Sequence, residues 1–133
     1  MIAVLDASAA IEVALNNEYA AVFREALSTA DIVIAPDTYP SEITNVFWKY
    51  ARFSEIEQAT CEKGIDYCLD LVDDYIVTKN ICREVFLESI NTRHSSYDVF
   101  YLVAARRHNA VLLTRDKQMI QIAKEFKIKV LAE

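Results

Sequence analysis

The sequence contains almost no glycine. Gly64 is the single glycine among 133 residues. The glycine-rich turns G-x-x-x-x-G-K and G-x-G-x-x-G, whose backbone N–H groups hold nucleotide phosphates, therefore cannot form in this chain. This absence excludes nucleotide-dependent enzymes of those two types.

Cysteine and histidine are also scarce. The three cysteines, Cys61, Cys68 and Cys82, are odd in number and have no C-x-x-C spacing, so we expect neither a disulfide framework nor a zinc site. Cys61 and Cys68 lie two helical turns apart and are expected to face the core, because free cysteine is often buried. The two histidines form no H-E-x-x-H pattern, which argues against a histidine-based metal site.

Long apolar runs and a strong positive charge are missing as well. No segment approaches the ~20 apolar residues that span a membrane. The N-terminus has no basic region and Asp6 interrupts it early, so we expect no signal peptide, no membrane association and a cytoplasmic protein. The net charge of −6 at pH 7 argues against a broad basic face for nucleic acid. It leaves open a nucleic-acid enzyme whose acidic residues hold cations.

The residues that are present predict a compact α/β domain. Hydrophobic residues make up 53% of the chain, enough for a buried core, and the length predicts a single domain over 1–133. Short apolar segments alternate with helical patterns, which is typical of a parallel sheet covered by helices on both faces. The predicted strands are 2–5, 32–35, 75–77, 110–113 and 128–131.

Helical periodicity fills the intervals between these strands. Two helices are expected before residue 32, because Glu18 restarts the pattern after Asn16 and Asn17. Pro40 favours a first helical turn, and it begins the next predicted helix. The remaining helices, starting with that one, are predicted over 40–53, 54–73, 80–91, 96–108 and 116–126.

Four acidic residues lie where predicted helices begin. Asp6 follows the first strand, Glu42 lies in the first turn of the third helix, and Asp98 and Asp116 lie at the starts of the last two helices. In parallel sheets, ligands bind beyond the carboxyl ends of the strands, where the helices begin. We therefore expect the four carboxylates at one edge of the sheet.

Each acid also has a purely structural interpretation. Asp6 or Asp116 could be a helix N-cap, and Ser95-x-x-Asp98 matches a capping box. Glu42 could complement a helix dipole. These alternatives remain open at the level of single residues.

The cost of clustering favours a metal site. Two carboxylates ~4 Å apart repel by about 4 kcal/mol at an effective dielectric constant near 20, so a cluster of four requires protons or a divalent cation. Oxygen ligands without histidine select Mg²⁺ or Mn²⁺. Such ions support in-line attack on phosphorus, so clustering would predict phosphodiester chemistry.

Four segments together resemble the PIN-domain ribonucleases, and specifically the VapC-type toxins of toxin–antitoxin pairs. The resemblance covers essentially the whole chain, and its segments are VLDASA, SEITNVFWKY, SSYDVFYLVAARR and AVLLTRDKQM. It implies a three-layer α/β/α sandwich with a central parallel five-stranded sheet in the order 3-2-1-4-5. Where the family usually has glycine after the helix of the third acid, this chain has Asn109, which also tolerates the left-handed conformation that ends a helix.

The resemblance further implies an Mg²⁺- or Mn²⁺-dependent endoribonuclease. The catalytic and metal-binding residues would be Asp6, Glu42, Asp98 and Asp116. Ser8 and Thr114 match the small hydroxyl residues beside the metal. The implied partners are RNA, a second copy of the chain in a homodimer, and a cognate antitoxin in the groove near the acids.

Further residues extend this interpretation. Arg115 and Lys117 lie close to the acids in sequence and could bind the substrate. Trp48 falls off the apolar stripe of its helix, and aromatic residues are favoured where proteins meet, so we expect it in a dimer or antitoxin interface.

Alternative functions stay open. A stand-alone RNA-processing PIN nuclease, or a PIN-like domain that binds RNA or a partner without cutting, would have a similar sequence. Phosphoacceptor proteins fit less well. Dehalogenase-like phosphatases carry D-x-D where this chain has Asp6-Ala7-Ser8, and receiver domains need an acceptor Asp after the third strand, where YIVTK has none.

Overall fold

The computed structural model describes residues 1–53 and 56–131. Its sheet has five parallel strands in the order β3-β2-β1-β4-β5, so the predicted order 3-2-1-4-5 is confirmed. The strands are β1 (Ile2–Leu5), β2 (Ile32–Pro36), β3 (Asp74–Ile76), β4 (Val111–Leu113) and β5 (Val130–Leu131).

Strand β1 lies at the centre of the sheet. Ala3 is in register with Val33 of β2 on one side and with Val111 of β4 on the other. Ala3, Val4 and Leu5 are wholly buried, because helices cover both faces. The unbroken apolar sequence of β1 is therefore the consequence of its central position.

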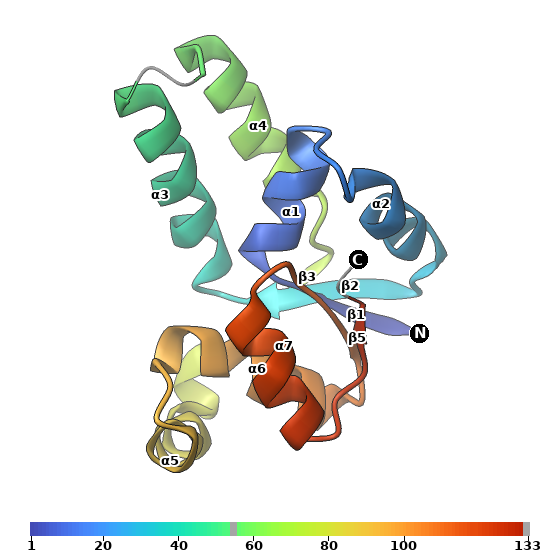
Figure 1. Ribbon diagram of the computed structural model, residues 1–133, viewed down its shortest axis with the longest axis vertical. Helices are drawn as coiled ribbons and strands as arrows, with labels where there is room; N and C mark the ends of the chain where they lie inside the picture. The colour runs from blue at the N-terminus through green and yellow to red at the C-terminus, as the bar shows by residue number, and fades with distance from the viewer. Residues whose placement is uncertain (54–55, 132–133) are drawn as a thin grey trace.

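The helices form two layers, one on each face of the sheet. Helices α1 to α4 lie on one face and α5 to α7 on the other, and α3 and α4 extend away from the sheet as a hairpin (Figure 1). Within the described residues, no helix is both long and apolar enough to cross a membrane. The helices are α1 (Ala7–Ala14), α2 (Ala20–Thr29), α3 (Tyr39–Arg52), α4 (Gln58–Asp70), α5 (Cys82–Thr92), α6 (Ser96–His108) and α7 (Lys117–Glu125).

The single glycine sets the spacing of the α3–α4 hairpin. A Cβ atom at Gly64 would lie 2.5 Å from Cζ of Phe47, and the Phe47 side chain is 1% exposed. No larger residue fits at position 64 without displacing a buried aromatic ring.

The predicted helix over 54–73 is too long. Ser54 lies outside the described residues, and α4 begins at Gln58 because Glu57 has extended backbone angles and is its N-cap residue. The helix ends at Asp70, and the Asp73 carboxylate then accepts a hydrogen bond from the backbone N–H of Val33. The chain is therefore already joining the sheet at Asp73.

Smaller shifts affect other element ends. The third strand is one residue earlier than predicted, and the last two strands are shorter. A 3₁₀ helix, η1 (Thr78–Asn80), which was not predicted, precedes α5. Asn109 adopts the expected left-handed conformation, with φ 50° and ψ 45°, and Cys61 and Cys68 are free and buried as expected.

Candidate active site

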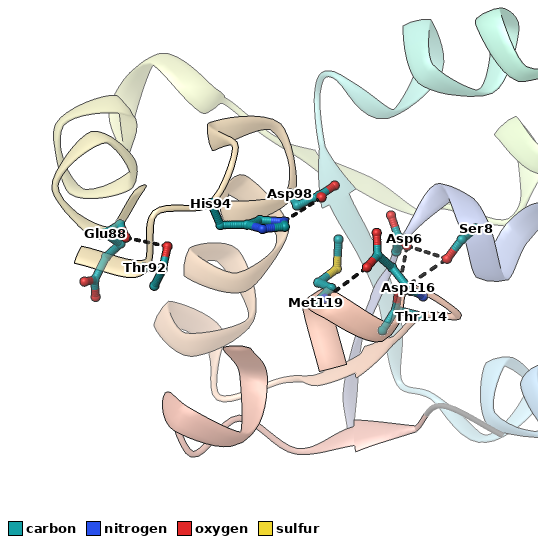
Figure 2. A network of polar contacts seen from close by, with 9 residues as sticks. All are labelled: Asp6, Ser8, Glu88, Thr92, His94, Asp98, Thr114, Asp116 and Met119. Atoms are coloured by element: carbon teal, nitrogen blue, oxygen red, sulfur yellow. Dashed lines mark hydrogen bonds and ion pairs between the residues drawn. The ribbon is translucent and has the colours of Figure 1, made fainter. Parts of the chain in front are cut away.

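The four predicted acids lie on elements that meet at the carboxyl edge of the sheet. Asp6 directly follows β1 and Glu42 is in the first turn of α3. Asp98 is in the first turn of α6, and Asp116 is the N-cap residue of α7. Figure 2 shows Asp6 and Asp116 side by side, with Asp98 nearby. The expectation from parallel-sheet topology is met at the level of elements.

The Asp6 carboxylate is buried and held by two hydroxyl groups. Asp6 is 5% exposed. Its Oδ2 accepts hydrogen bonds from Ser8 Oγ at 2.5 Å and from Thr114 Oγ1 at 2.8 Å. Asp6 is the N-cap residue of α1, but within the described chain its side chain makes no hydrogen bond to that helix. The capping role predicted for the Asp6 carboxylate is therefore wrong.

The pKa of Asp6 is raised, in part by its acidic neighbours. Burial raises the pKa of Asp6 to about 6, and repulsion from Asp98 and Asp116 adds to that rise. The bonds from Ser8 and Thr114 act in the opposite direction, because they stabilise the charged form. Asp98 and Asp116 therefore both lie close enough to repel Asp6.

Glu42 belongs to the same electrostatic group. Burial raises its pKa to about 7, with repulsion from Asp6 and Asp98 in the same direction. The phenol of Tyr101 on α6 donates a hydrogen bond to Glu42 Oε2 at 2.5 Å, which lowers the pKa of Glu42 in part. Glu42 therefore does more than complement a helix dipole.

Asp98 is hydrogen-bonded to His94, one of the two histidines for which the sequence predicts no metal site. His94 Nε2 lies 2.9 Å from Asp98 Oδ2. Ser95 is the N-cap residue of α6, yet within the described residues its side chain makes no capping bond. The capping-box interpretation is therefore wrong. His94 and Asp98 are four residues apart, a spacing that brings side chains together on a helix. The sequence did not predict this contact, because α6 begins at Ser96, between the two residues.

Asp116 does cap its helix. Its Oδ1 accepts a hydrogen bond from the backbone N–H of Met119 at 3.0 Å. Thr114 Oγ1 accepts from the Asp116 N–H at 3.0 Å while it donates to Asp6. The N-cap interpretation of Asp116 is confirmed, and Thr114 links the two acids.

The predicted substrate-binding residues differ in their surroundings. The Arg115 guanidinium donates to Glu12 Oε2 at 3.4 Å and lies over the Tyr19 ring, 4.0 Å from its centroid. The backbone N–H of Arg115 donates to Ser8 Oγ. Lys117, the first residue of α7, is exposed. Arg115 is therefore engaged within its own chain, which the sequence could not show because Glu12 is 103 residues away.

Other arginines are also paired internally. Arg106 forms ion pairs with Glu84 and Glu88, and Arg107 pairs with Glu84. The Arg106 guanidinium also lies over the Phe126 ring. These contacts join α5, α6 and the end of α7, so the basic cluster of α6 serves the packing of this layer.

The donor set fits a hard divalent cation. Its members are carboxylates, two of them with raised pKa values because they are buried and repelled, and a cation of high charge relieves that repulsion. Among the residues that the structure describes, no three acidic, cysteine or histidine side chains already stand close enough to hold an ion. Each aspartate instead contacts its own partner, so binding would require small movements of side chains.

The chain belongs to the PIN domain family. The family model for the PIN domain matches residues 3–125, and PIN domains are generally nucleases that act on RNA. The crystal structure of PAE2754 from Pyrobaculum aerophilum has the same fold, with a TM-score of 0.76 and 21% sequence identity. That similarity covers 93% of this chain and 89% of the other. Among curated proteins, no sequence matches this chain.

Proposed function

We propose that this PIN domain is an Mg²⁺- or Mn²⁺-dependent endoribonuclease of the VapC type, and the toxin of a type II toxin–antitoxin pair. The observation that carries the proposal is the repulsion of the buried Asp6 by both Asp98 and Asp116. A protein keeps such a costly arrangement of like charges where a cation binds or a reaction needs it. Membership of the PIN domain family supports RNA as the substrate.

Asp6, Asp98 and Asp116 would hold the ion in this proposal, and Glu42 would complete the site directly or through a water. When bound, such an ion supplies positive charge that stabilises in-line attack on phosphorus. Ser8 and Thr114 keep the Asp6 carboxylate in one orientation. Tyr101 occupies Oε2 of Glu42, which leaves Oε1 to orient the attacking water and accept its proton. A pKa of about 7 suits that role near neutral pH.

Lys117 and Arg115 would contact the RNA backbone. Lys117 is exposed at the start of α7, next to Asp116, and among the described residues it has no ion pair that binding a phosphate would break. Arg115 would first have to leave Glu12. We therefore expect substitution of Lys117 to weaken RNA binding more than substitution of Arg115.

The proposed partners are an antitoxin and a second copy of the chain. Trp48 on α3 is 56% exposed, with the Arg52 guanidinium 5.8 Å from its ring centroid. Trp48 also lines a surface hollow between α3 and α4, with Phe47 and Ile65. A half-exposed tryptophan beside a hollow is typical of an interface anchor.

Substitution of Trp48 tests this interface. Trp48→Ala should delay elution of the purified protein or weaken antitoxin binding. Phe86→Ala, an exposed residue in the opposite helical layer, is the matched control. Unchanged elution and antitoxin affinity for Trp48→Ala would place the interface elsewhere.

RNA cleavage by purified variants tests the proposed activity. The wild-type protein should cut single-stranded RNA with Mg²⁺ or Mn²⁺ and stop when EDTA is added. Asp6→Asn should lose cleavage and should no longer be stabilised by Mn²⁺ in thermal melts. Asp66→Asn, the same change at an exposed position of α4, should behave like the wild type.

Two results would overturn the proposal in different ways. Full cleavage by Asp6→Asn would show that the acids are structural. RNA binding by the wild type without cleavage under any divalent ion would indicate a PIN-like domain that binds without cutting.

A further inference from the structure

His94 occupies a fixed position beside the proposed metal site. Arg93 ends α5 in the left-handed conformation, with φ 58°, which turns the chain and brings His94 toward Asp98 at the start of α6. The His94 side chain is 14% exposed, and the Asp98 side chain is 32% exposed. The histidine is thus largely enclosed while the carboxylate still faces solvent in part.

The hydrogen bond between the two residues has a defined direction. A carboxylate anion only accepts hydrogen bonds, so toward Asp98 in that form His94 Nε2 is the donor to Oδ2. In the part of the chain that the structure describes, the Asp98 side chain has no other hydrogen bond. Its Oδ1 is therefore free to bind a cation.

Two forces would move Asp98 if His94 were absent. Asp98 is the third residue of α6, a position from which an acidic side chain readily turns back to the N-cap N–H. Repulsion between Asp98 and Asp6 also pushes the carboxylate away from the site. The hydrogen bond from His94 opposes both movements. In Figure 2, the His94 ring approaches Asp98 from the side opposite to Asp6.

We propose that His94 is a positioning residue that holds the Asp98 carboxylate in place for the divalent cation. The inference rests on the proposed function, because it takes Asp98 as a metal ligand. Carboxylate ligands are usually fixed by hydrogen bonds from outside the metal's own shell, and losing such a partner typically costs about 10–100-fold in metal affinity or activity. His94 is such a partner for Asp98.

Mn²⁺ binding to purified variants tests the proposal without an activity assay. The concentration of free Mn²⁺, followed by electron paramagnetic resonance, gives the affinity directly. His94→Leu keeps the approximate size of the side chain and removes the donor, so its affinity for Mn²⁺ should fall about 10–100-fold. His94→Gln places an amide N–H near the position of Nε2 and should restore most of that loss.

His108→Leu is the matched control. His108 is the last residue of α6 and is exposed, and the substitution is chemically identical. It should leave Mn²⁺ affinity unchanged. Rescue by glutamine, together with this control, separates positioning from a general effect on the fold.

The possible outcomes are decisive. If His94→Leu binds Mn²⁺ as tightly as the wild type, the role of His94 is overturned while the proposed metal site stands. If the wild type neither binds Mn²⁺ nor cuts RNA with any divalent ion, the proposed function fails and this inference fails with it. If His94→Leu does not fold, His94→Gln is compared with His94→Asn, whose shorter amide does not reach Asp98. Equal affinities of that pair would overturn the proposal.

Discussion

Tyr101 and Glu42 join the two helical layers at the carboxyl edge of the sheet. The wholly buried Tyr101 phenol of α6 donates to the Glu42 carboxylate of α3, and this bond lowers the pKa of Glu42 against the effect of burial. The two residues are 59 positions apart. The pKa of Glu42, the residue proposed to accept the proton of the attacking water, is thus lowered by a residue of the other helical layer.

Removing the phenol should raise the pKa of Glu42 above about 7. Tyr101→Phe takes away a donor that favours the charged form, and it should also cost about 1.5–3 kcal/mol of stability, the usual range for a hydrogen bond to a charged group. Carboxyl ¹³C resonances followed by NMR against pH would measure the pKa. Tyr97→Phe, at an exposed position of the same helix, should leave it unchanged.

The metal-free protein should lose stability as pH rises from about 4 to about 7. The pKa of Asp6 rises from 3.8 to about 6 on folding and that of Glu42 from 4.5 to about 7. In this window the folded state therefore binds protons that the unfolded state has released. For the buried Asp6 the loss amounts to about 3 kcal/mol. Urea denaturation at a series of pH values measures it.

Asp6→Asn isolates this effect from other titrations. Glu88, whose pKa is lowered by its hydrogen bond from Arg106, contributes the opposite slope at lower pH. The free energy of unfolding of the wild type, measured relative to that of Asp6→Asn, should fall as pH rises from about 4 to about 6. If the free energies of unfolding of the two proteins changed with pH in parallel, the raised pKa of Asp6 would be contradicted.

Asp116 should separate capping from metal binding. Asparagine caps helices about as well as aspartate, whereas alanine costs about 0.5–2 kcal/mol. Asp116→Asn should therefore keep the metal-free stability and lose the stabilisation by Mn²⁺, while Asp116→Ala should lose both. Thermal melts with and without Mn²⁺ measure the two effects. Stabilisation of Asp116→Asn by Mn²⁺ equal to that of the wild type would remove Asp116 from the metal site.

Gly64→Ala should destabilise the protein even though alanine favours a helix. The gain in helix propensity is about 1 kcal/mol, and overpacking a buried site costs about 1–3 kcal/mol, here against the Phe47 ring. A loss of up to about 2 kcal/mol is expected in urea denaturation. In the Phe47→Leu background the same substitution should become neutral or stabilising, and an equal loss in both backgrounds would exclude the clash.

The fold class follows from the sequence because central parallel strands are unbroken apolar runs. The β1 segment and the helix over 96–108 are both predicted with the observed bounds. The third strand begins one residue earlier than predicted. Its bounds are set by pairing with a strand that is distant in sequence. Asp74 is in register with Ile34 of β2, and no pattern within 75–77 indicates that.

The acids of the candidate site could be predicted, but their partners could not. Asp6 directly follows β1, and Asp116 lies in the short segment between β4 and α7, so topology alone brings them to one edge. The contacts from Tyr101 to Glu42 and from Arg115 to Glu12 join residues 59 and 103 positions apart. The bond between His94 and Asp98 is local, but it depends on the left-handed turn at Arg93. The sequence does not predict that turn, because the residue is not glycine.

Because Arg106, Arg107 and Arg115 already pair with carboxylates of their own chain, these three arginines would add few phosphate contacts when RNA binds. Each phosphate contact to a single strand contributes about 0.7 to the slope of log affinity against log salt concentration. A site with one or two available cations would therefore have a shallow slope. The affinity of such a nuclease for RNA would change little with ionic strength.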